Sequence, residues 1–225
     1  MQKILMVAMA LIVACGVVFA EKDEQKELNK ERQEIRKLAQ SELKVKVDKN
    51  TKKEAKRLAK EGWEVQPGAH PMEKQLERSY LMQYEYDDNN YPKYIMGEAS
   101  SIGENYDAAK TAAMSLAITN LAGQIQTEVS ALIENTVGNK QLAPEDAASI
   151  AETVMASKNS IAQSIGRVIS VTEMYRRVKN KNYEVLVRIA YNGEMAKQAT
   201  KNAVREELEK KGMDLHVQLD KVLGF

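Results

Sequence analysis

The most regular pattern in the chain is a series of apolar residues at every fourth position between Asn105 and Val137. This spacing predicts an amphipathic helix of roughly thirty residues. Asn105 or Asp107 provides the side chain that caps its first turn. The apolar positions are Ala109, Ala113, Ala117, Leu121, Ile125, Val129 and Ile133. Because the first three are alanines, we expect another element to approach this half of the helix closely.

A second helix is predicted over residues 145–165. Gly138 and Asn139 end the first helix, and Pro144 opens the next, followed by two acidic residues in its first turn. Its apolar positions are Ala147, Ile150, Ala151, Val154, Ile161 and Ile165. The two segments therefore predict a long helical hairpin.

After Gly166 the apolar period changes from that of a helix to that of a strand. Residues 168–178 are rich in β-branched side chains, and residues 183–191 alternate strictly. The polar residues 179–182 between them predict an antiparallel hairpin. The expected core-facing residues are Val185, Val187 and Ile189, and the expected solvent-facing ones are Glu184 and Arg188.

The remaining elements complete an α+β fold. A further strand is expected over residues 94–99, a helix over residues 194–211 and a last short helix around residues 215–223. We therefore predict a small antiparallel sheet of about three strands, with the helical hairpin and the C-terminal helix packed on one of its faces. This domain would extend over residues 62–225.

Residues 21–61 differ in composition and are predicted to form a charged helical arm. Residues 21–60 contain 14 Lys or Arg and 9 Asp or Glu, without Pro or Gly. The sparse apolar residues fit one or two polar helices with a narrow apolar seam. Such an arm could contact an acidic envelope polymer or a partner helix. We favour a solvated helix that docks on the domain by its seam.

Residues 1–20 have the order of a secretory signal peptide: a basic start, an apolar run from Ile4 to Ala14, and a small residue before the charged arm. We expect cleavage after Ala20. The alternative is processing at Cys15, which would carry a lipid and bring the protein to a membrane. Cys15 is the only cysteine, so the mature chain would have no internal disulfide.

Charge and residue types exclude several classes of function. Removing Lys3 with the signal leaves 32 basic and 32 acidic residues. The mature chain therefore has no excess of positive charge that would indicate nucleic-acid binding. His70 and His216 are far apart in the sequence, so no metal site is expected. Residues 87–90 lack the pattern of a calcium-binding loop. Residues 97–103 lack a Gly-x-Ser-x-Gly motif and are expected to form a strand-to-helix loop.

We therefore expect no catalytic residues and no cofactor. The remaining candidate is a group of tyrosines, which could stack on sugars or bind a peptide, or could simply lie where the sheet meets a helix. These are Tyr80, Tyr84, Tyr86, Tyr91 and Tyr94. We favour the second interpretation, a core or rim position.

Three blocks of this chain resemble bacterial envelope lipoproteins of the LPP-twenty type, over residues 90–210. They are Tyr94-Ile95-Met96-Gly97-Glu98-Ala99, the alanine-stepped helix through Leu121-Ala122-Gly123-Gln124-Ile125, and Tyr183-Glu184-Val185-Leu186-Val187-Arg188-Ile189. The charged arm, and residues 53–63 in particular, are instead similar to uncharacterised secreted proteins of Gram-negative gut bacteria. The resemblance implies an envelope location and a structural or adhesive role, without catalytic residues.

The expected function is that of a non-enzymatic, exported cell-envelope protein, periplasmic or associated with the outer membrane of a Gram-negative bacterium. It would bind a protein, an envelope polymer or a second copy of itself. The alternative is an envelope hydrolase or ligand-binding protein with a site near residues 97–106.

Overall fold

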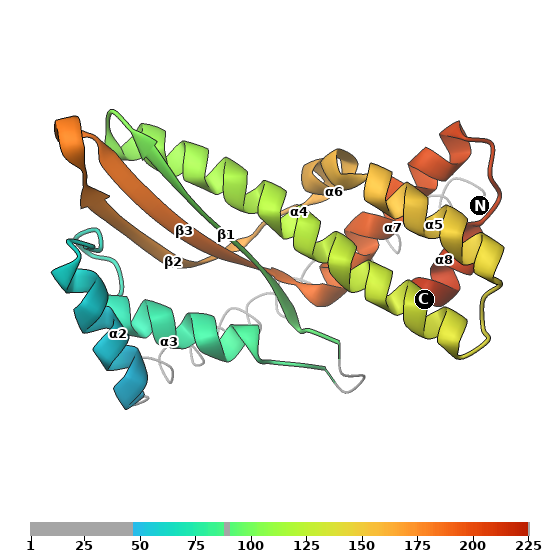
Figure 1. Cartoon of the computed structure of the whole chain (residues 1–225), viewed down its shortest axis with the longest axis horizontal. Coiled ribbons are helices and arrows are strands. Elements are labelled where there is room, and N and C mark those ends of the chain that lie inside the picture. The colour runs from blue at the N-terminus through green and yellow to red at the C-terminus, as the bar shows by residue number, and fades with distance from the viewer. Residues whose placement is uncertain (1–46, 88–90, 225) are drawn as a thin grey trace, which may run out of the picture. The chain divides into compact units, whose positions relative to one another are not determined.

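The computed structural model describes residues 47–87 and 91–224, which belong to a compact unit that begins at Val47 (Figure 1). It confirms the α+β fold class: a three-stranded antiparallel sheet, in the order β1-β3-β2, is packed by helices. The strands are β1 (Tyr94–Gly103), β2 (Ile169–Arg177) and β3 (Tyr183–Asn192). The helices are α2 (Lys49–Lys60), α3 (Met72–Gln83), α4 (Tyr106–Gly138), α5 (Pro144–Ala156), α6 (Lys158–Ser164), α7 (Gly193–Lys210) and α8 (His216–Leu223).

The central strand β3 has the predicted inner face. Val185, Val187 and Ile189 are fully buried, as their alternation requires. Strand β1 pairs with one edge of β3, with Ala99 opposite Val187, and β2 pairs with the other edge. The β2–β3 connection is a short 3-10 turn, Lys179–Lys181, as expected for a hairpin.

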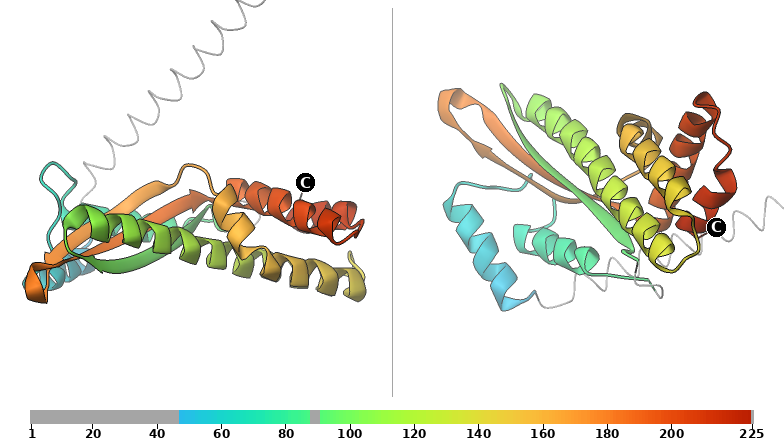
Figure 2. Two further views of the ribbon diagram at one scale, coloured as in Figure 1. Left: turned by 90° about the horizontal axis from the view of Figure 1, so that it is seen from above. Right: turned by 45° about the vertical axis from the view of Figure 1, so that its right-hand side comes forward.

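Helix α4 packs its alanine stripe on the inner face of the sheet, as predicted. Ala109, Ala113 and Ala117 are fully inaccessible to solvent. The approach is so close that a Cβ atom on Gly97 of β1 would overlap the carbonyl oxygen of Ala117 and lie 2.7 Å from the Cβ of Leu121. The second half of α4 extends beyond the sheet, alongside α5 and α7 (Figure 2).

Residues 97–103 do not form the expected loop. They continue β1 as far as Gly103, so that the helix α4 follows the strand almost directly. Asn105 begins α4 as predicted, because its side-chain Oδ1 accepts a hydrogen bond from the backbone N–H of Ala108 at 2.9 Å. The expectation was wrong because the small polar residues of this segment are typical of a loop, whereas their pairing with residues of β3 determines the strand.

The prediction of helices on only one face of the sheet was also wrong. On the outer face, α3 places Leu76 against Met174 of β2, and α2 packs on α3 through Ala55. Two charged residues of β3 were expected in solvent, but both have partners in this layer. Arg188 pairs with Glu98 and donates a 2.6 Å hydrogen bond to Ser79 of α3, while Glu184 pairs with Arg176.

The compact unit starts earlier in the sequence than the predicted arm–domain boundary at residue 61. Helix α2 lies within this unit, and its seam contributes Ala55 and Leu58 to a cluster with Trp63 and Leu76. The docked-helix interpretation therefore holds for α2. Residues 21–46 of the arm, and the expected signal peptide, lie outside the described residues.

The predicted helix over residues 145–165 is divided into α5 and α6 at Ser157. The side-chain amide of Gln126, on α4, donates hydrogen bonds to the carbonyl oxygens of Val154 and Met155, at 2.6 and 3.0 Å. In an uninterrupted helix these carbonyls would accept from N–H groups four residues ahead. The buried amide replaces those donors, which makes the break tolerable.

Replacing Gln126 by Met should therefore destabilise the fold while keeping the side-chain volume. The buried carbonyl of Val154 and the part-buried carbonyl of Met155 would lose this donor, so we expect the free energy of unfolding to fall by about 1–3 kcal/mol. Urea denaturation followed by circular dichroism measures this difference. Gln124→Met on the exposed side of α4 is the control, with an expected change within about 0.5 kcal/mol. Equal losses in both variants would contradict the proposed role of Gln126.

Candidate functional site

The five tyrosines singled out in the sequence separate into two groups. Tyr91 is buried, and Tyr94 is half-buried against a small separate cluster of Met82, Val171 and Ala190. Tyr80 donates a hydrogen bond from its hydroxyl to Glu54 of α2 at 2.5 Å, and partial burial with this carboxylate raises the pKa of Tyr80 to about 12. These three have the expected core or rim role. Tyr84 and Tyr86 do not, since 71% and 56% of their surface is exposed.

The exposed pair follows Leu81 closely in the sequence, and we call these three exposed residues the aromatic surface (Leu81, Tyr84 and Tyr86). Leu81 is 59% exposed and lies three residues before Tyr84 at the end of α3, so the two side chains share one side of the helix. Single exposed apolar residues are normal on proteins, whereas neighbouring ones mark interaction sites. The aromatic surface is therefore the first candidate for a functional site.

A closed backbone loop holds Tyr86 in place. The N–H of Lys93 donates to the carbonyl of Glu85, and the N–H of Asp87 donates to that of Tyr91, both at 2.9 Å. The side chains of Glu85 and Lys93 form an ion pair, and the Asp87 carboxylate accepts a 2.8 Å hydrogen bond from the N–H of Tyr91. The two sides of the loop thus form a small hairpin with Tyr86 bridged to the residue opposite it.

The base of this loop is anchored in the core. The ammonium of Lys197, on α7, lies 4.1 Å from the centre of the Tyr91 ring, over its face. A side chain at Gly193 would overlap the carbonyl oxygen of Pro92, so the start of α7 presses directly on the loop. Because both ends of the loop are fixed, Tyr86 is presented with little conformational freedom to lose on binding.

A second tyrosine cluster was missed in the sequence because its members come from different elements. Tyr106 of α4 packs edge-to-face on Tyr175 of β2 at 5.5 Å, and Tyr183 of β3 lies 6.2 Å from Tyr175. Glu173 accepts hydrogen bonds from the hydroxyl of Tyr106 and from Lys110. Burial and this carboxylate raise the pKa of Tyr106. With these polar groups paired, the cluster attaches the start of α4 to the sheet.

The other sequence candidates do not converge. His70 precedes α3 and His216 begins α8, and no group of three metal-binding side chains occurs among the described residues. Asp87 stabilises its own loop, and residues 88–90 lie outside the described ranges. Cys15 and Ala20 also lie outside them. No helix in the part of the chain that the structure describes is long and apolar enough to cross a bilayer.

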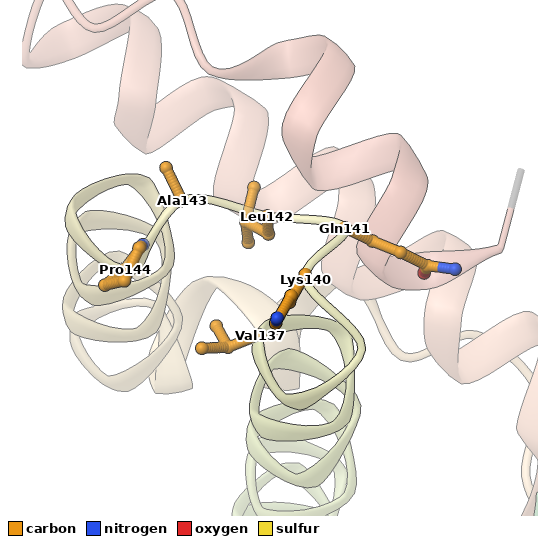
Figure 3. Close-up of a pocket in the computed structure, with 6 residues that line it drawn as sticks. All are labelled: Val137, Lys140, Gln141, Leu142, Ala143 and Pro144. Carbon is orange, nitrogen blue, oxygen red and sulfur yellow. The ribbon is translucent and has the colours of Figure 1, made fainter.

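The structure also has a hollow of about 410 Å³ at the α4–α5 connection (Figure 3). Its lining residues are Val137, Lys140, Gln141, Leu142, Ala143 and Pro144. The amine of Lys140 is the one ionisable group in that lining, so the hollow provides no acid–base pair. It does not resemble a catalytic site.

Comparisons with known proteins found no match of this chain to a protein-family model, a curated protein or a solved structure.

Proposed function

We propose that the chain is an exported cell-envelope protein that binds a macromolecular partner through the aromatic surface and has a structural rather than a catalytic role. The observation that supports the binding role is the exposure of Leu81, Tyr84 and Tyr86 beside the hydrogen-bonded segments 85–87 and 91–93. The proposal of export is supported by the order of charged and apolar residues in positions 1–20. The resemblance to LPP-twenty-type envelope proteins supports the same location, periplasmic or at the outer membrane.

Tyrosine suits this role for physical reasons. Its ring buries a large apolar area, while its hydroxyl can bond to water or to a partner. It also has few rotatable bonds, and tyrosines dominate the binding energy of many protein interfaces. A protein partner therefore fits the aromatic surface best, and a second copy of the chain is included in that class.

The alternative function, a hydrolase or ligand-binding site near residues 97–106, has no observation in its favour. This segment consists of the end of β1 and the capped start of α4, rather than the loop that would present side chains to a substrate.

Intact-mass measurement of the protein from its native envelope tests export. The mass of a chain that starts at Glu21 would confirm cleavage after Ala20. An acylated Cys15 at the N-terminus would instead identify a lipoprotein, and retention of residues 1–20 in soluble cytoplasmic protein would contradict export.

Site-specific photo-crosslinking in living cells tests the binding role. A photoreactive phenylalanine derivative at Tyr84 or Tyr86 should give one discrete protein adduct. The same group at Met155 of α5, which is 61% exposed, is the matched control and should give none. Adducts of the same kind at all three positions, or at Met155 alone, would contradict a specific partner at the aromatic surface.

A further inference from the structure

Helix α2 presents a continuous basic face away from α3. Its inner side is formed by Thr51, Ala55 and Leu58, of which the first two are buried and the third is partly buried. Successive residues turn by about 100° around a helix, which places five exposed cations on the opposite side and the half-buried Lys52 at its edge, six in all. They are Lys49, Lys52, Lys53, Lys56, Arg57 and Lys60.

Among the described residues, Arg57 is the cation of this face that forms ion pairs. Arg57 is paired on one flank with Glu54 and Glu61, at 3.7 and 3.6 Å. By contrast, no ion pair joins Lys52, Lys56 or Lys60 to a described acidic residue, although these lysines follow one another at four-residue spacing. Like charges at that spacing destabilise a helix. Repulsion between these lysines therefore lowers the stability of α2, and an anionic partner would relieve this repulsion.

The β2–β3 turn adds cations at the same end of the compact unit (Figures 1 and 2). The segment after α2 is fixed to the end of β2 by paired backbone hydrogen bonds between Glu64 and Tyr175, at 2.8 and 2.9 Å. The guanidinium of Arg176 also stacks on Trp63, 4.5 Å from the ring centre. Lys179 and Lys181, in the turn itself, are exposed.

We propose that this basic surface (Lys49, Lys52, Lys53, Lys56 and Lys60 with Lys179 and Lys181) binds the anionic headgroups of a phospholipid membrane. Flexible lysines on the outside of a helix act as point charges, which suits a field of phosphate groups more than the fixed geometry of one ligand. The apolar side of α2 is already occupied by α3. The protein therefore rests on the membrane by charge alone and does not insert α2.

This contact goes beyond the partner binding proposed above and uses a different surface. It also has a consequence for the two ways in which the N-terminus could be processed. A lipid on Cys15 would tether the N-terminus to a membrane, and the basic surface would add a second contact that holds the domain against it. After cleavage at Ala20, the same surface would give a peripheral and reversible association.

Co-sedimentation of the mature protein with lipid vesicles tests the proposal. Vesicles of phosphatidylcholine with about one third phosphatidylglycerol should bind the protein at low salt. Vesicles of phosphatidylcholine alone should bind it much more weakly. The triple variant Lys52→Gln, Lys56→Gln, Lys60→Gln should reduce the partition coefficient on the order of 100-fold, from the usual contribution of each lysine near an anionic surface. Binding should also fall steeply as salt increases.

A matched control removes the same charge elsewhere. Lys140→Gln, Arg167→Gln, Lys221→Gln replaces three exposed cations outside the basic surface and should leave binding within about threefold of the original protein. The double variant Lys179→Gln, Lys181→Gln lies in another element and should weaken binding about tenfold or more. It tests the proposal independently of the stability of α2, and thermal unfolding monitors the fold of every variant.

Three results would overturn the proposal. The first is equal binding to both kinds of vesicle, and the second is an equal loss in the triple variant and its matched control. The third is binding of a soluble acidic polysaccharide, such as polygalacturonate, more tightly than the anionic vesicles at the same salt. That result would identify an envelope polymer as the occupant. None of these results would affect the crosslinking test at Tyr84, which examines partner binding at the aromatic surface.

Discussion

Replacing Val187 by Asp is expected to lower the free energy of unfolding by about 3–5 kcal/mol, the range for an uncompensated buried charge. Val187 is fully buried at the centre of β3. Its neighbour across the β2 pairing is Glu173, so the new carboxylate would also face a like charge. Urea denaturation followed by circular dichroism gives the difference directly.

The matched control places the same substitution in solvent. Val217 of α8 is 65% exposed, and Val217→Asp should change stability by no more than about 0.5 kcal/mol. Similar losses in the two variants would mean that the inner face of the sheet has been assigned incorrectly.

Replacing Gly97 by Ala is expected to lower the free energy of unfolding by about 1–3 kcal/mol. In most strands this change would be favourable, because alanine loses less backbone freedom on folding than glycine. Here the new methyl group would overlap the backbone oxygen of Ala117, which cannot move without displacing α4 from the sheet. The sign of the measured change therefore reports how closely helix and strand approach.

Gly166 provides the control for this prediction. A Cβ atom there would meet nothing within 4 Å, and Gly166→Ala should be neutral or stabilise the protein by up to about 1 kcal/mol. If Gly97→Ala stabilised the protein as well, the close packing of α4 on β1 would be contradicted.

Much of the fold could be predicted because periodicity is a local property. The alternation around Val187 identified the inner face of β3, and the four-residue step through Ala113 identified α4 and its closely packed side. Both patterns can be read within one element, and both correspond to fully buried residues in the structure. Helix caps also depend on residues close in the sequence, as shown by Asn105, whose side chain accepts a hydrogen bond from the N–H of Ala108.

The remaining features depend on residues far apart in the sequence. The break at Ser157 follows from Gln126 of another helix. Arg188 was expected in solvent because charged residues alternate with apolar ones there, yet Ser79 and Glu98 cover it. For the candidate site, the sequence identified the tyrosines. It could not show that Tyr91 would be buried under Lys197 while Tyr84 and Tyr86 stayed exposed.

The pairing of β1 with β3 also determines when the sheet can form. Glu98 and Arg188, which meet across this pair, are 90 residues apart in the chain. Contacts of such high sequence separation slow folding, because a large loop must be closed before they contribute. In contrast, α4 makes its backbone hydrogen bonds within one segment and can form early. During synthesis the complete sheet can therefore cover the inner face of α4 only after β3 has been made, when more than four fifths of the chain is present.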